Sequence, residues 1–142
     1  MIEEKWAALV PDLVCEYIET SQRLYCDIIG FSVRFVRPED KFAYLDLGGA
    51  QLMLEQLHAE CWITAPLDRP FGRGMNLQIE VPEVAPIHAR LRAAGLPVFE
   101  EPKEAWYRAE DIEHGQIEML VQDPDGYLLR FVEVLEPRTL TD

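Results

Sequence analysis

Two segments of the sequence repeat one order of predicted elements, and this repeat restricts the possible folds more than any other feature. In each copy a predicted strand leads into a helix that ends at a glycine, Gly30 or Gly95, and an apolar strand follows. Glycine readily adopts the left-handed conformation that closes many helices, so both positions mark helix ends. Further alternating segments complete each copy, which gives a strand, a helix and three strands, twice.

The first copy is predicted at about residues 8–58. Its first strand, at 8–16, contains Pro11, which lacks a backbone donor and therefore indicates an edge position or the start of a strand. A helix is predicted at 18–29 from an apolar stripe at helical spacing. The other elements of this copy are strands at 31–37, 42–47 and 51–57, separated by turns at 38–40 and 48–49.

The second copy is predicted at about residues 74–135, after a linker at about 59–73. The linker contains several prolines and glycines together with large aromatic side chains. The predicted elements of this copy are a strand at 75–81, a helix at 82–94, a short strand at 97–101, a polar loop, and a strand at 116–122 that leads into a final hairpin. The polar loop is expected to carry Trp106, Tyr107 and His114.

The final hairpin is predicted from Asp123-Pro124-Asp125-Gly126, because these residue types favour a tight turn. In the strand that follows, Leu128, Arg130 and Val132 share one face, while Leu129 and Phe131 share the other. Both faces are mostly apolar, which indicates a strand covered on both sides. Arg130 would then need a partner, since a buried charge is costly when it is unpaired.

The composition indicates one globular domain with an acidic surface. The chain has 142 residues, with 13 basic and 26 acidic side chains and a net charge of −13. This balance argues against nucleic acid as a partner, whose phosphates attract Lys and Arg. It suits a cationic ligand, although net charge also serves solubility alone.

Cysteine usage and hydropathy suggest a cytoplasmic protein. The three cysteines are an odd number without a Cys-x-x-Cys pair, and a free cysteine in an apolar element acts as a small hydrophobic residue. The sequence has no signal-peptide pattern and no apolar run of about 20 residues, so no membrane partner is expected.

Three patterns in this order resemble the vicinal oxygen chelate superfamily, which includes glyoxalase I, extradiol dioxygenases and bleomycin resistance proteins. The patterns are Ser21-x-x-Leu24-Tyr25 with Ile29-Gly30-Phe31, Leu52-Met53-Leu54-Glu55, and Asp123-Pro124-Asp125-Gly126-Tyr127. The resemblance covers about residues 9–133. It implies an α+β fold for residues 1–142, in which two tandem βαβββ modules form a cupped mixed sheet with the helices on its outer face.

The resemblance also implies where a metal would be held, because enzymes of the superfamily use four side chains at equivalent positions. The matching positions here are Val10, Glu55, Asn76 and Arg130, and of these only Glu55 is a good ligand. Asp12 is the one acidic residue near Val10, and Pro11 leaves its direction open. The closest resemblance is therefore to bleomycin resistance proteins, which implies no metal, no cofactor and no catalytic residues.

One other spacing of metal-binding residue types occurs in the sequence. Glu55, His58 and Cys61 are three residues apart, and on a helix they would share one face. They are predicted instead at a strand end that runs into a loop, so the sequence favours no metal there.

The expected function is sequestration of a cationic, planar, antibiotic-like small molecule in a cleft shared by two subunits of a homodimer. Glu55 and Arg130 would face this cleft and pair, or Arg130 would pair with another carboxylate, within or across subunits; a purely structural ion pair is the alternative. The other expected ligand-binding residues are Trp62, Phe71, Trp106, Tyr107 and His114. The loop aromatics would otherwise pack the loops or form the dimer contact.

The sequence is also compatible with two other functions. One is a metal-dependent glyoxalase- or dioxygenase-type enzyme of the same superfamily, and the other is a binding protein for an uncharged metabolite. The identity of the ligand, binding of bleomycin itself and any exchange of strands between subunits are not determined by the sequence.

Overall fold

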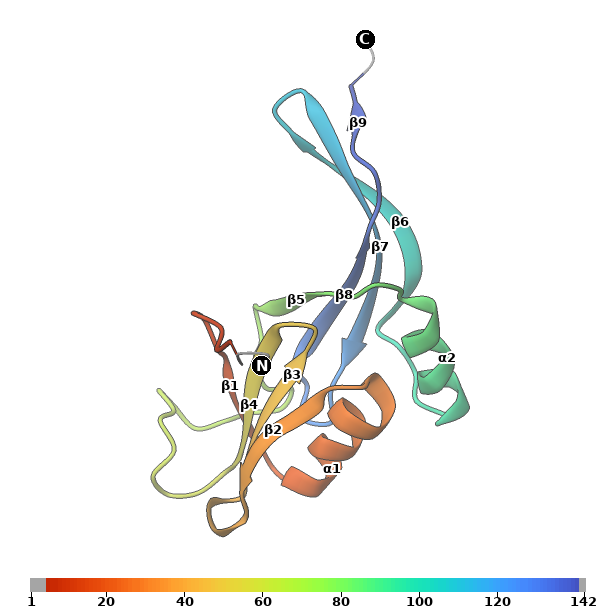
Figure 1. Ribbon diagram of the computed structural model, residues 1–142. Helices are drawn as coiled ribbons and strands as arrows, with labels where there is room; N and C mark the ends of the chain where they lie inside the picture. The colour runs from red at the N-terminus through yellow and green to blue at the C-terminus, as the bar shows by residue number, and fades with distance from the viewer. Residues whose placement is uncertain (1–4, 141–142) are drawn as a thin grey trace.

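The computed structural model describes residues 5–140, which form two sheets and three longer helical segments (Figure 1). The first sheet has the strand order β1-β4-β3-β2, in which β1 runs parallel to β4 and the other neighbours are antiparallel. The elements of this module are β1 (Asp12–Cys15), α1 (Ile18–Gln22), η1 (Arg23–Ile29), β2 (Ser32–Arg37), η2 (Pro38–Asp40), β3 (Phe42–Leu47) and β4 (Ala50–Gln56).

The second sheet repeats this topology with the order β5-β8-β7-β6, and a short strand β9 also pairs with β7. Again the first strand is parallel to the last, and the remaining neighbours are antiparallel. Its elements are β5 (Asn76–Glu80), α2 (Ala85–Ala93), β6 (Glu100–Ala109), β7 (Ile112–Gln122), β8 (Leu128–Val134) and β9 (Arg138–Thr139). The matching orders confirm the predicted α+β fold of tandem βαβββ modules.

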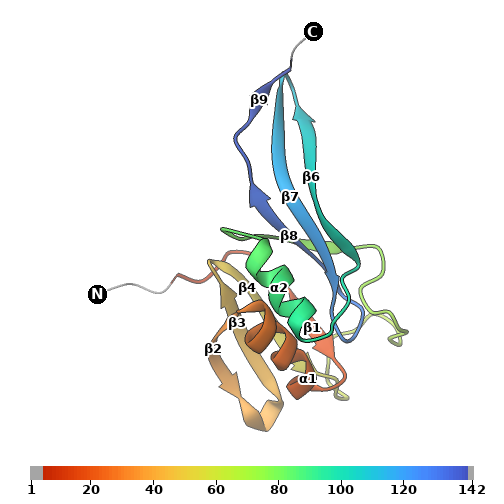
Figure 2. The same ribbon diagram turned by 90° about the vertical axis from the view of Figure 1, so that its right-hand side faces the viewer.

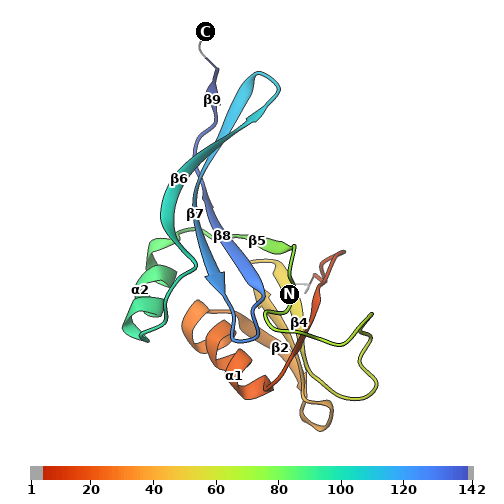
Figure 3. The same cartoon turned by 180° about the vertical axis from the view of Figure 1, so that it is seen from behind.

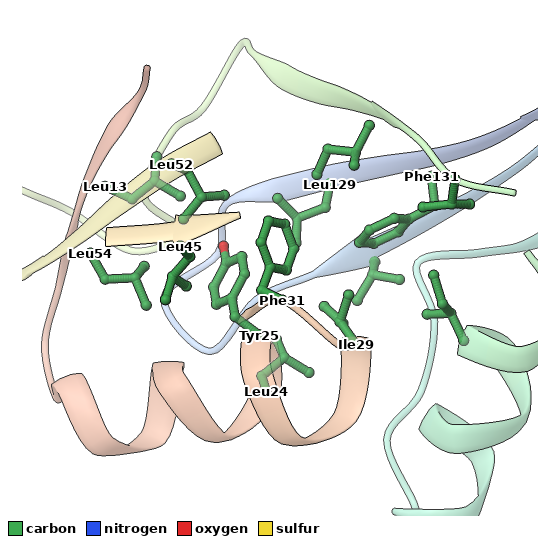
Figure 4. Packing of buried hydrophobic residues seen from close by; sticks show 14 of the residues in the cluster. Leu13, Leu24, Tyr25, Ile29, Phe31, Leu45, Leu52, Leu54, Leu129 and Phe131 are labelled. Carbon is green, nitrogen blue, oxygen red and sulfur yellow. The ribbon is translucent and has the colours of Figure 1, made fainter. Parts of the chain in front are cut away.

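One hydrophobic core joins the two modules. The continuous helix formed by α1 and η1 lies next to α2, which packs against η1. The two helices cover the same side of the molecule (Figure 2). Tyr25 is fully buried at the centre, edge-on to Phe31 with the ring centroids 5.6 Å apart, and Phe131 of the second sheet belongs to the same cluster (Figure 4). Burial of each such side chain contributes about 1.5–3 kcal/mol relative to exposure.

The first helix ends at Gly30, as predicted. Its second half is a π-helix, and Gly30 has a φ of 115° in the left-handed region. The amides of Gly30 and Phe31 both donate to the carbonyl of Tyr25. From the other module, the Arg90 guanidinium donates to the carbonyls of Ile28 and Ile29 at 2.6 and 2.7 Å, so α2 supplies donors for the open end of this helix.

The final hairpin also forms as predicted, and it links the two modules. One carboxylate oxygen of Asp123 accepts hydrogen bonds from the amides of residues 125, 126 and 127, each at 2.9 Å. Its other oxygen accepts from the Tyr25 hydroxyl at 2.7 Å. Asp125 accepts from the amide of Glu16 at 3.0 Å, and the Tyr127 hydroxyl donates to the carbonyl of Val14 at 2.9 Å. The turn therefore fixes the start of the first module.

The polar loop predicted between the strands at 97–101 and 116–122 is wrong. Trp106 and Tyr107 lie in β6 and His114 lies in β7, and these two strands form a long hairpin that extends away from the helices (Figures 1 and 3). Most side chains of β6 are polar and exposed, so the alternation that marks a strand is missing from the sequence. Backbone pairing with β7 makes the segment a strand nonetheless.

The first strand begins later than the sequence suggested. β1 starts at Asp12 and not near residue 8, directly after Pro11, and it lies at the edge of its sheet. Among residues 5–140, no helix is long and apolar enough to cross a membrane.

Candidate ligand-binding cavity

The first sheet carries an open cavity of about 1320 Å³ on the face that points away from the helices. Strand alternation explains this division of side chains. Leu13, Leu45 and Leu54 point into the core, whereas Tyr44 and Glu55, their neighbours on β3 and β4, line the cavity. The same strands thus build the core with one face and a candidate site with the other.

Four aromatic side chains cluster in the cavity. Phe35 and Tyr44 are stacked, with centroids 5.3 Å apart and an interplanar angle of 17°, and Phe42 lies 5.8 Å from Phe35. Trp6 stands edge-on to Tyr44 at 5.0 Å. None of the four was predicted as a ligand-binding residue. The feature that could have identified them is the pairing of β3 with β4, because it places Phe42 opposite Glu55 and therefore on the same face of the sheet.

Gln51 fastens the segment that carries Trp6 over the sheet. Its carboxamide oxygen accepts from the Ala7 amide at 2.8 Å and from the Tyr44 hydroxyl at 2.5 Å. Its nitrogen donates to the Lys5 carbonyl at 2.8 Å and to Asp46 at 2.9 Å. Because this buried amide uses both of its ends, the aromatic wall of the cavity is preorganised.

Asp12 of β1 and Glu55 of β4 are two carboxyl groups that line the same cavity. Asp12 is exposed on one side, and partial desolvation on its other side raises its pKa to about 6. Its interaction with Glu55 adds to this shift, and the attraction of Arg37 opposes it. For Glu55, burial raises the pKa, but hydrogen bonds from Asp12, His58 and Cys61 outweigh this and hold it below the ordinary value. Because both side chains line this cavity, Asp12 shares the Glu55 face, which the sequence does not determine.

Glu55 also meets two side chains from the turn that follows β4. Its Oε1 lies 2.6 Å from Nε2 of His58 and accepts from the Cys61 thiol at 3.4 Å. Burial raises the pKa of Cys61 above its ordinary value, and the nearby carboxyl groups act in the same direction. A carboxylate, an imidazole and a thiol thus meet at one point.

Of the residues expected to bind a ligand, Glu55 and Trp62 line this cavity. Trp62 lies on the linker with its side chain fully exposed. Phe71 lies elsewhere: it is buried edge-on to Tyr127, with centroids 6.1 Å apart, and the Arg69 guanidinium lies 5.2 Å from its ring.

Arg130 lies in a separate polar cluster on the second sheet. Its guanidinium is 4.0 Å from Glu118, and Glu118 in turn accepts from the Tyr107 hydroxyl at 2.8 Å and from Gln116 at 2.9 Å. The hydrogen bond to Glu118 raises the pKa of Tyr107. Of the two expected pairings, with Glu55 or with another carboxylate, the chain therefore forms the second, between Arg130 and Glu118.

Trp106 and His114 lie farther along the β6–β7 hairpin. The Trp106 ring covers Gly115 on the opposite strand and has the Arg138 guanidinium 3.8 Å from its centroid. His114 is exposed and pairs in register with Tyr107. The structure thus divides the expected residues between the cavity, the Arg130 cluster and the outer hairpin.

The positions equivalent to the metal ligands of the vicinal oxygen chelate enzymes do not form a metal centre. Val10 has no donor atom, and Asn76 is an exposed neutral amide at the start of β5. Arg130 brings a permanent positive charge to the fourth position, and its Nε is buried without a hydrogen-bond partner among the residues described. Glu55 is the one residue of the four that fits a metal.

Comparison with known proteins supports a family assignment. The family model for the Glyoxalase/Bleomycin resistance protein/Dioxygenase superfamily matches residues 9–131. No curated protein matches the chain. Among solved structures, a member of this superfamily from Vibrio splendidus 12B01 is 33% identical over 89% of this chain and 97% of its own, with a TM-score of 0.42.

Two more distant structures share the fold. TioX from Micromonospora sp. ML1 is 20% identical, with coverage of 92% of this chain and 100% of its own and a TM-score of 0.70. A virulence protein from Salmonella typhimurium is 21% identical, with coverage of 95% and 100% and a TM-score of 0.64. At these identities the similarity concerns the fold and not the function.

Proposed function

Because the chain belongs to the glyoxalase/bleomycin resistance protein/dioxygenase superfamily, we propose that it is a binding protein for a flat, cationic small molecule. The ligand would occupy the cavity of the first sheet and be sequestered there, as in bleomycin resistance proteins, without the four-ligand metal centre of the superfamily's enzymes. The observation that carries this proposal is the cluster of Trp6, Phe35, Phe42 and Tyr44 in one cavity with acidic side chains.

The charge of the cavity favours a cation. Two basic side chains, Arg37 and Lys41, line it. The acidic side chains outnumber them: Asp12, Glu39, Asp40, Glu55 and Glu60. Aromatic faces attract cations by about 0.5–2 kcal/mol, and nearby carboxylates add Coulomb attraction.

The protein's own Arg37 supports the idea that these rings hold a cation. Its guanidinium lies 4.0 Å from the Phe42 centroid and 5.8 Å from that of Phe35. Arg37 is also paired with Asp40 at 3.1 Å on an exposed part of the chain, where it can move aside. A planar cation that enters the cavity would take over the Arg37 position on the rings.

The second candidate is a metal-dependent enzyme of the glyoxalase or dioxygenase type. The meeting of Glu55, His58 and Cys61 favours it, because these atoms suit a transition metal. Turnover of a hemithioacetal or a catechol by protein supplied with Zn²⁺, Ni²⁺ or Fe²⁺ would establish this candidate. We expect no turnover, since Arg130 and Val10 replace two ligands of the enzymes.

We further propose a homodimer in the cytoplasm. Arg130 and Glu118 form a polar face on the second sheet, part of which extends away from the helices (Figure 1). In the proposed dimer, this face of one copy would lie over the first-sheet cavity of the other copy. Sedimentation velocity on the purified chain tests this directly: a mass of one chain at micromolar concentration contradicts it.

Calorimetric titration with proflavine, a planar dye that is cationic at neutral pH, tests the binding site. We expect Phe35→Ala and Glu55→Gln each to weaken binding about tenfold, through loss of a ring face and of a charge. Phe99→Ala and Glu19→Gln are matched controls, because Phe99 is exposed outside the cavity and Glu19 lies on α1. Equal affinities for all four variants would place the dye elsewhere and contradict the proposed site.

A bleomycin-type glycopeptide is the second ligand for the same titration. Heat that saturates at one ligand per chain would extend the proposal to antibiotic resistance. No heat at high micromolar ligand would exclude this drug and leave the binding of planar cations to be judged by the dye.

A further inference from the structure

The turn after β4 brings three kinds of metal-binding atoms together at the edge of the cavity. The ligand atoms of Glu55, His58 and Cys61 all lie within 4.8 Å of one another. We propose that these three side chains bind a transition-metal ion, with Zn²⁺ as the favoured ion. The site shares Glu55 with the metal positions of the superfamily's enzymes, but its other two ligands come from the turn after β4.

Glu55 already contacts each of the other two side chains through a proton that a metal would replace. Glu55 Oε1 lies 2.6 Å from His58 Nε2 and 3.4 Å from Cys61 Sγ. The His58 amide donates to Cys61 Sγ at 3.4 Å, and the Cys61 amide donates to the His58 carbonyl at 3.2 Å. The turn is therefore closed by its own backbone and holds the ligands on one side.

The chemistry of the donor atoms selects the ion. Thiolate and imidazole favour Zn²⁺ and its neighbours in the transition series, whereas Mg²⁺ and Ca²⁺ prefer oxygen alone. One cysteine, one histidine and one glutamate provide three protein ligands, and water can complete a tetrahedron, as in open zinc sites. Metal binding displaces the thiol proton of Cys61, as for other structural and catalytic thiolates.

Asp12 acts as a positioning residue for this site. It lies on β1, next to the parallel strand β4, and lines the same cavity as Glu55. Carboxylates that hold a metal ligand in place commonly change affinity by 10–100-fold when they are removed. Asp12→Asn is therefore expected to weaken metal binding about tenfold and to leave Cys61 as a thiolate ligand of the bound ion.

His58 needs one local adjustment. Its Nδ1 accepts from the Glu60 amide at 3.1 Å, so the neutral ring carries its proton on Nε2, toward Glu55. Binding through Nε2 moves the proton to Nδ1 and releases the Glu60 amide. Glu60 is exposed and the His58 side chain is 43% exposed, so water can take over that bond at small cost.

Cobalt absorption gives a signal that a role in hydrogen bonding alone would not produce. The full chain is freed of metal with a chelator, dialysed and titrated with Co²⁺. We expect one ion per chain, a thiolate-to-cobalt charge-transfer band in the near ultraviolet, and displacement of the band by Zn²⁺. Absence of the band at stoichiometric Co²⁺ and micromolar protein contradicts the site.

Variants assign the band to these residues. Cys61→Ser is expected to abolish it, and His58→Gln to weaken Zn²⁺ binding at least about tenfold. Cys26→Ser is the matched control, since Cys26 is a free, partly buried cysteine outside the cluster, and it should keep the band. Circular dichroism verifies that each variant folds. A band that survives Cys61→Ser, or one that disappears with Cys26→Ser, overturns the proposal.

Discussion

Asp123 shows how much of this fold depends on one side chain. It joins three backbone amides of the final hairpin to the hydroxyl of Tyr25, which lies at the centre of the core. The carboxylate is buried, so none of these donors can turn to bulk water when the acceptor is lost. The hairpin that appears in the sequence as a turn signal is thus also a connection to the first helix.

Replacement of Asp123 tests this role. Asp123→Ala is expected to lower the free energy of unfolding by about 3–5 kcal/mol, because buried amides and the Tyr25 hydroxyl lose their acceptor. Tyr25→Phe removes one of those hydrogen bonds and should cost about 1 kcal/mol. Urea denaturation of both variants measures the difference, and equal losses would show that the amides do not depend on Asp123.

Gly126 is required by space as well as by backbone conformation. Its φ is 109°, and an added Cβ would lie 2.4 Å from the Cβ of Pro70 and 2.8 Å from the amide nitrogen of Phe71. Gly49 has a similar φ of 99°, but nothing lies within 4 Å of its added Cβ. The two positions separate the cost of conformation from the cost of a clash.

Alanine at each glycine measures these costs. Gly49→Ala is expected to lose about 1–2 kcal/mol from the left-handed backbone alone. Gly126→Ala should lose about 1–3 kcal/mol more, because the linker must move. Thermal or urea unfolding compares them, and a Gly126 variant as stable as the Gly49 variant would contradict the close packing of the linker on the hairpin.

At the level of elements, regular apolar alternation was predictable and polar strands were not. The strand at 42–47 has the predicted bounds, and both helices end at the predicted glycines. The β6–β7 hairpin was missed, because its stability comes from pairing between strands with exposed polar side chains. The sequence feature that could have indicated this hairpin is Gly115, because a glycine within a strand often faces a large side chain on the neighbouring strand. Here Gly115 of β7 leaves room for the Trp106 ring on β6.

A double replacement tests the Trp106–Gly115 contact. An added Cβ at Gly115 would lie 2.4 Å from the Trp106 ring, so Gly115→Ala is expected to destabilise the chain by about 1–3 kcal/mol. In a Trp106→Ala background the same change should cost less, because the ring is gone. Additive losses in urea denaturation would show that the two residues do not pack against each other.

At the scale of the molecule, the two modules share one topology, but their sheets present different side chains on the face away from the core. The first has aromatic rings and carboxylates, whereas the second has the Arg130 cluster. The sequence identified Glu55 and Trp62 at the cavity but not its aromatic wall. Phe42 and Tyr44 look like ordinary strand residues until the pairing of β3 with β4 assigns their face, and Trp6 reaches the cavity through bonds between Gln51 and the chain start.

The two proposals meet at Glu55, which would serve both the metal and the cationic ligand. Zn²⁺ at this residue removes the negative charge that attracts the ligand, so the two should oppose each other. We expect one equivalent of Zn²⁺ to weaken proflavine binding about tenfold in the parent chain and to have no effect in Cys61→Ser. Equal affinities with and without Zn²⁺ in the parent would separate the two sites.

The most direct test of the cavity's preference compares two ligands of one shape. Proflavine is cationic at neutral pH, and acridine has the same ring system and is mostly uncharged there. Calorimetric titration of the metal-free chain with each is expected to give one proflavine site per chain, bound at least about tenfold more tightly than acridine. Equal or tighter binding of acridine, or no binding of proflavine, would contradict a cavity built for planar cations.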